Sequence, residues 1–152
     1  MSTHTDALKL LARRELSAAE LRSRLLDRTH RPEDVDAVIS HLIADGSVDD
    51  ARVARAYART AAVVKGRGRV RVLRELHAMG IAREIAAEAV EEVFRDINEE
   101  EAIERAIAKK TRGRPVRSVQ ERARLHRLLL RQGFTPGAIS AALRHLKAAE
   151  DQ

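Results

Sequence analysis

Basic side chains concentrated in two stretches are the residues of this 152-residue chain best suited to chemistry. The first stretch surrounds two glycines in the segment KGRGRVRVLRELHAMGI, residues 65–81, and its cations are Lys65, Arg67, Arg69, Arg71 and Arg74. The second lies in the last third of the chain, and its candidate binding residues are Lys109, Lys110, Arg112, Arg114, Arg117, Arg124 and Arg127. Because the planar fork of Arg pairs with carboxylates and phosphates, both stretches predict contact with an acidic protein surface or a nucleic acid.

The overall charge agrees with that prediction. The net charge is +6, and residues 100–152 hold 12 Lys and Arg against 6 Asp and Glu. A basic excess favours a polyanionic or acidic partner through charge steering and counterion release. The simpler interpretation of any single Arg is that it makes a helix surface soluble and binds no partner, and that alternative applies to some of these residues. Aromatic residues are rare, so stacking on single-stranded bases is a weak candidate.

Other chemistries find little support. The six histidines form no metal-binding spacing, and the chain has no cysteine. The acidic residues are scattered and do not pair as a general acid and base. Gly66 and Gly68 suggest a phosphate-binding loop, but the Lys-Ser/Thr ending is missing, so a helix break is the better interpretation. We therefore expect a non-enzymatic protein with no catalytic residue, cofactor or metal.

The elements that position these cations are predicted to be helices, since strong helix formers dominate the composition. After a frayed start over residues 1–4, a helix over 6–16 should bury Leu8, Leu11 and Ala12. Ser17 and Glu20 form a capping box, which predicts a helix starting at Ser17. Pro32 suits the first turn of a helix running to about residue 44, with Gly46 as its C-terminal cap.

Similar signals continue along the chain. A helix after residues 47–50 should break at the two glycines, the next should end at Gly80, and another should cover residues 85–94. Asn98 should cap the following helix, which leads into a basic loop over 109–117. Helices over 122–132 and from Pro136 to about residue 149 complete the prediction.

An internal repeat organises these helices. Three pairs of apolar residues are four apart, and each is followed ten residues later by another apolar residue: Leu21/Leu25 with Val35, Val72/Leu76 with Ala86, and Leu125/Leu129 with Ile139. The pattern predicts an all-α fold of three tandem three-helix repeats over residues 1–46, 47–97 and 98–152. We expect neighbouring repeats to share core surface in an elongated, curved array.

The central stretch also resembles a known family. Asp49 to Tyr57 (DDARVARAY), Lys65-Gly66-Arg67-Gly68, the segment RVLREL over 71–76 and Gly80-Ile81 are similar in order and spacing to the signature of the bacterial RecX regulatory proteins. The opening LLARR over 10–14, with Ser17 and Glu20-Leu21, also resembles that family. The resemblance covers roughly residues 7–148, with Val53 departing from the aromatic residue that the family often has.

The resemblance implies a protein that binds RecA recombinase and the RecA–DNA filament and inhibits strand exchange and ATP hydrolysis. The residues themselves leave open whether RecA or DNA makes the primary contact. The alternative is an autonomous helix-turn-helix-like DNA-binding protein. With no membrane-spanning run and no signal segment in the sequence, we expect a cytoplasmic protein, without membrane contact and monomeric.

Overall fold

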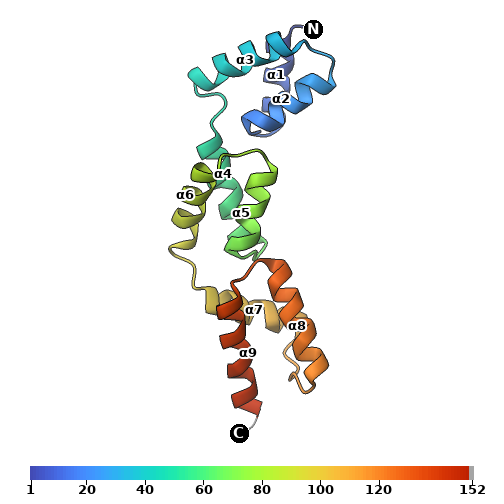
Figure 1. Cartoon of the computed structure of the whole chain (residues 1–152), viewed down its shortest axis with the longest axis vertical. Helices are drawn as coiled ribbons and strands as arrows, with labels where there is room; N and C mark the ends of the chain where they lie inside the picture. The colour runs from blue at the N-terminus through green and yellow to red at the C-terminus, as the bar shows by residue number, and fades with distance from the viewer. Residues whose placement is uncertain (151–152) are drawn as a thin grey trace. The chain divides into compact units, whose positions relative to one another are not determined.

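The computed structural model describes residues 1–150 of the chain (Figure 1). These residues form nine α-helices and one π-helical turn, with no strand among them, which confirms the prediction of an all-α fold. The elements are α1 (Thr3–Arg13), α2 (Ala18–Asp27), α3 (Pro32–Ala44), α4 (Asp50–Arg59), the π-helical turn η1 (Thr60–Val64), α5 (Arg69–Ala78), α6 (Arg83–Phe94), α7 (Glu99–Thr111), α8 (Val119–Gln132) and α9 (Pro136–Glu150). Within the described part of the chain, no helix has both the length and the apolar composition needed to cross a lipid bilayer.

The contacts divide the chain into two compact units. Unit 1 contains Met1–Tyr57 and Glu75–Ala89, and unit 2 contains Ala58–Arg74 and Val90–Gln152. The division therefore falls inside α4, α5 and α6, so each of these helices contributes residues to both units.

Unit 1 has its own apolar core where α1, α2 and α3 pack together (Figure 1). The buried side chains of this core are Ala7, Leu10, Leu16, Leu21, Leu25, Val35, Ile39, Leu42 and Val48. The predicted capping box is present, because the Glu20 amide donates to Ser17 Oγ and the Ser17 amide donates to Glu20 Oε1. The Ser17 hydroxyl also donates to the Met79 carbonyl at 2.6 Å, which ties the start of α2 to the end of α5 within the unit.

The buried face of α1 differs from the prediction. Leu8 is 43% exposed and Ala12 is exposed, whereas Ala7 and Leu10 are buried. A buried carboxylate sets this rotation: Asp6 accepts from Arg28 at 2.5 Å and lies 2.8 Å from His30 Nε2, so its side of the helix must face inward. The helix also starts earlier than expected.

The N-terminus is ordered by a helix cap. Ser2 Oγ accepts the Thr5 amide at 3.1 Å, and α1 begins at Thr3, so the expectation of a frayed start was wrong. The cap satisfies an amide that the first turn of the helix leaves without a partner.

Unit 2 has a second core, which α7, α8 and α9 enclose (Figure 1). Its buried residues are Ile103, Ile107, Val116, Leu125, Leu129, Phe134, Ile139, Ala142 and Leu143. Two boundaries here were predicted wrongly. α7 continues to Thr111, so Lys109 and Lys110 are helical, and α8 starts at Val119, where Ser118 Oγ accepts the Glu121 amide at 3.0 Å.

The repeat pattern is confirmed by burial. All nine positions that defined it are at most 4% exposed: Leu21, Leu25, Val35, Val72, Leu76, Ala86, Leu125, Leu129 and Ile139. The same register therefore carries an inward apolar side chain in each three-helix repeat. The repeat boundaries and the curvature of the array stay predictions.

Candidate partner-binding surface

The central basic stretch begins at a sharp turn after the π-helical turn η1. Gly66 has a φ of +66°, a left-handed conformation that favours glycine, and the helix cannot continue through it. The Arg67 amide donates to the Ala61 carbonyl at 2.9 Å, which folds the turn back on η1. Lys65 is exposed at this turn, whereas Arg67 is only half-exposed.

Gly68 has a different role, because it touches the end of α8. Its amide donates to the Gln132 carbonyl at 2.7 Å, and the Val70 amide donates to the Gly133 carbonyl at 3.0 Å. A Cβ on Gly68 would lie only 2.5 Å from the Gly133 carbonyl atoms, so no larger residue fits without movement of the backbone. The interpretation of Gly68 as a simple helix break therefore missed its main role. This backbone contact fixes the start of α5 against the end of α8 within unit 2.

Two arginines of the central stretch are partly committed to this packing. The Arg69 guanidinium carbon lies 5.6 Å from the centroid of the buried Phe94 ring, which is a cation–π contact. Arg71 Nη1 donates to Gln132 Oε1 at 3.4 Å. These contacts orient both side chains. Arg69 is nevertheless exposed, as is Arg74 on the same helix.

A shallow hollow joins the central stretch to α8. Arg71, Arg74, Leu130 and Arg131 line it, and all four belong to unit 2. Three guanidinium groups therefore gather around one exposed leucine. Arg131 was not among the predicted binding residues, although its spacing from Arg124 and Arg127 already placed the three on one face of a helix.

Arg131 also lines a second, less open groove between α7 and α8, which we call the α7–α8 groove. Its volume is about 490 Å³. The groove is bounded by the end of α7, the connection to α8 and one face of α8, and its lining residues are Lys110, Thr111, Arg114, Pro115, Val116, Glu121, Arg124, Leu125, Arg127, Leu128 and Arg131. The apolar members form a floor that includes buried Val116 and Leu125, while five cations and one carboxylate surround it.

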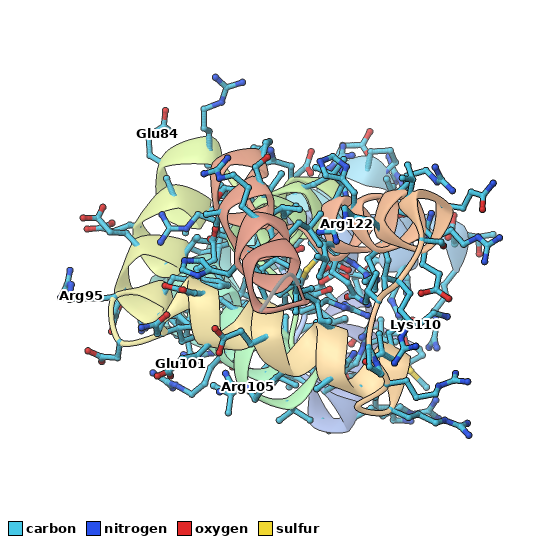
Figure 2. The ribbon with its side chains drawn as sticks, turned by 90° about the horizontal axis from the view of Figure 1, so that it is seen from below. Glu84, Arg95, Glu101, Arg105, Lys110 and Arg122 are labelled. Carbon is cyan, nitrogen blue, oxygen red and sulfur yellow. The ribbon has the colours of Figure 1, made fainter. Side chains whose placement is uncertain are left out.

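The remaining candidate residues lie outside the groove. Lys109, Arg112 and Arg117 are exposed but do not line it, and the Arg117 amide donates to Glu121 Oε2 at 3.2 Å. Arg122 faces the other way and donates to the Leu143 carbonyl at 2.6 Å, which joins α8 to α9. Figure 2 shows Arg122 near α9 and Lys110 at the far end of α7 from Glu101.

Parts of both predicted stretches thus line the hollow and the groove on unit 2, whereas Lys65, Arg67 and Arg69 of the central stretch line neither. We define the basic surface on unit 2 by the residues that line the hollow and the groove: Arg71, Arg74, Lys110, Arg114, Arg124, Arg127 and Arg131. Elsewhere, the hydrogen bond with His30 chiefly lowers the pKa of Asp6, which is a structural effect in unit 1. Among the described residues, no group of three or more His, Asp or Glu side chains is arranged to hold a metal.

The fold and surface define an all-helical protein built from three-helix repeats. Two family models match the chain: "RecX, first three-helix domain" over residues 5–42, and "RecX, second three-helix domain" over residues 49–90. The chain belongs to the RecX family, as the resemblance in its central stretch predicted.

Curated relatives agree over most of the chain. The regulatory protein RecX of Chromohalobacter salexigens is 36% identical over 140 residues, covering 92% of this chain and 90% of the relative. A regulatory protein RecX of Thermus thermophilus is 38% identical over 138 residues, covering 91% of this chain and 87% of the relative. These relatives are named regulatory proteins, so the chain belongs to a family of regulators.

Solved structures share the fold. The crystal structure of RecX from Lactobacillus salivarius superposes with a TM-score of 0.76 at 20% identity and covers 96% of this chain and 95% of that one. A second RecX crystal structure gives a TM-score of 0.74 at 15% identity and covers 92% of this chain and 69% of that one. At these identities the similarity concerns the arrangement of the helices.

Proposed function

We propose that this protein binds RecA and the RecA–DNA filament and inhibits strand exchange and the associated ATP hydrolysis, without performing a reaction itself. Membership of the RecX family gives the regulatory class. The observation that carries the proposal further is the basic surface on unit 2, in which hollow and groove share Arg131. Such a surface suits the phosphates and carboxylates that a protein–DNA filament exposes.

The charges of this surface would act together. Exposed charge pairs contribute little individually, about 0.2–1 kcal/mol each, so several must form at once for useful affinity. Because such pairs are screened by salt, binding to the filament should weaken steeply as ionic strength rises. The backbone contacts that hold α5 against α8 would keep the cations in a fixed arrangement, which reduces the entropy lost on binding.

The direct test is the rate of RecA-catalysed ATP hydrolysis on single-stranded DNA. We expect a substoichiometric amount of this protein to lower that rate, and we expect rising salt to weaken the effect. Full ATP hydrolysis in the presence of equimolar protein at low salt would refute the proposal.

A charge-reversed variant tests whether the central stretch makes the contact. Lys65→Glu with Arg74→Glu changes two exposed cations that have no structural partner among the described residues. We expect this variant to need about 10-fold more protein for equal inhibition, since it exchanges two attractions for two repulsions. Arg69 and Arg71 are left unchanged because their contacts also support the fold.

The matched control is Arg95→Glu with Arg105→Glu, which makes the same charge change at exposed sites of unit 2 outside the hollow and groove. Figure 2 shows Arg105 projecting outward from α7. An equal loss of inhibition in both variants would mean that only total charge matters. Tight, sequence-selective duplex binding without RecA in a gel-shift titration would instead favour the autonomous DNA-binding alternative.

A further inference from the structure

We propose that the α7–α8 groove is a binding site for a free polyphosphate, of the class of nucleoside triphosphates and inorganic triphosphate. The proposal goes beyond the regulatory function, because it concerns a small ligand and not RecA or DNA. It rests on the size of the groove, its uncompensated charge and the geometry of α8.

The size of the groove suits a small molecule. Its volume of about 490 Å³ falls in the range of roughly 300–1,000 Å³ that ligand sites commonly occupy. All of its walls come from unit 2, namely α7, α8 and the segment between them. The site therefore does not depend on any other part of the chain.

The charge of the groove calls for an anion. Five cations line it against one carboxylate, Glu121, which also accepts the Arg117 amide, so the lining is strongly positive. Within the described part of the chain, none of these five cations forms an ion pair with a carboxylate. The Arg114 Nε atom donates to the Thr111 carbonyl, at 3.2 Å, which is a neutral acceptor. Like charges gathered around one groove repel one another, and a bound anion would relieve that repulsion.

The helical geometry matches a chain of phosphates. Arg124, Arg127 and Arg131 are spaced three and four residues apart, so they follow one face of α8. Lys110 and Arg114 approach the same space from the end of α7 and the following connection. Guanidinium forks bind phosphate oxygens with two parallel hydrogen bonds, and a lysine adds a point charge. A triphosphate places three phosphates next to one another, whereas nucleic acid separates successive phosphates by a sugar.

The lining also predicts that the site does not distinguish between nucleotide bases. None of the three aromatic residues of the chain, Tyr57, Phe94 and Phe134, lines the groove. Without an aromatic platform, base stacking contributes little, and the apolar floor can accept any base or sugar. We therefore expect the phosphates to determine affinity, with little preference among nucleotides.

Isothermal titration calorimetry of the full chain at low salt, without Mg²⁺, tests the proposal with inorganic triphosphate, ATP, GTP, orthophosphate and a short oligothymidylate. We expect the three triphosphates to bind with dissociation constants within about 3-fold of one another, since base contacts add little. Orthophosphate should bind at least about 10-fold more weakly, because it engages fewer of the forks. No heat with any triphosphate would overturn the proposal.

The variant Arg124→Glu with Arg127→Glu should weaken inorganic triphosphate binding by about 10-fold or more, since each change removes charged hydrogen bonds to the ligand. The control Arg105→Glu with Arg144→Glu reverses two exposed cations of unit 2 that do not line the groove. It should bind within about 3-fold of the wild type, because only long-range screened charge changes. Helical circular dichroism confirms that both variants fold.

Two further results would overturn the proposal. Equal weakening in both variants would indicate a general charge effect without a defined site. Oligothymidylate that binds more tightly than triphosphate, and loses that affinity in the Arg124→Glu/Arg127→Glu variant, would make the groove a nucleic-acid backbone site. RecA is absent from these titrations, so failure here leaves the regulatory proposal untouched.

Discussion

Replacing Gly68 by alanine should destabilise unit 2 by separating α5 from α8. The new Cβ would lie 2.5 Å from the Gly133 carbonyl carbon and oxygen and 2.6 Å from the Phe134 nitrogen. Each of these is a backbone atom, so no flexible side chain can move aside. The start of α5 would have to shift away from α8, together with the two hydrogen bonds that join them.

The magnitude follows from those contacts. Each of the two backbone hydrogen bonds is worth about 0.5–1.5 kcal/mol. Overpacking a close contact typically costs about 1–3 kcal/mol. The lower entropy of the unfolded chain with alanine offsets about 0.4–1 kcal/mol of this loss. We expect the free energy of unfolding to fall by about 1–5 kcal/mol, since the steric and hydrogen-bond terms outweigh the entropy term.

Urea denaturation followed by helical circular dichroism measures this change, and Gly66→Ala is the matched control. Gly66 lies two residues away and has a left-handed φ of +66°, but nothing lies within 4 Å of its Cβ position. Its replacement should cost only the backbone strain, about 1 kcal/mol. The two variants therefore separate steric contact from conformational preference.

The comparison can refute the role of Gly68. A Gly68→Ala protein that unfolds within about 0.5 kcal/mol of the wild type would show that the contact with Gly133 is not needed for stability. A larger loss for Gly66→Ala than for Gly68→Ala would mean that the turn conformation, and not the close approach, matters in this segment.

Two further changes probe unit 1. Asp6→Asn should lower the free energy of unfolding by about 1–3 kcal/mol at neutral pH, since the buried carboxylate loses charged partners in Arg28 and His30. The fold lowers the pKa of Asp6 below its ordinary 3.8. The wild type therefore keeps this stability above pH 3.8 and loses it as the pH falls through the folded pKa. In urea denaturation at a series of acidic pH values, the free energy of unfolding of the variant should depend less on pH. Leu76→Ala should cost about 2–5 kcal/mol in urea, because Leu76 is fully buried. Val70→Ala on the same helix, 43% exposed, should cost under about 0.5 kcal/mol, and a similar loss in both would contradict the burial argument.

Much of the helical framework could be predicted because its signals are local. The capping box of Ser17, the first-turn Pro32 and the Asn98 cap each act within about four residues, and all three are present in the structure. The repeat was also visible, since a buried face recurs in the sequence wherever a helix has the same inward register. Family membership could also be predicted, because the motifs of the central stretch are continuous in the sequence.

Features that depend on residues far apart in the sequence could not be predicted from local patterns. The rotation of α1 is set by Asp6, whose partners Arg28 and His30 lie more than twenty residues away. Apolar spacing alone predicted that Leu8 is buried, because the local sequence pattern does not indicate that a carboxylate is buried on this helix.

The sequence by itself determined the helical class, the repeat and the presence of two basic stretches. Only the tertiary structure decided that Gly68 meets Gly133, sixty-five positions further along the chain, and that Arg131 belongs to both hollow and groove. The reason is physical: caps and periodicity are short-range properties of one helix, whereas a shared surface depends on how separate helices pack.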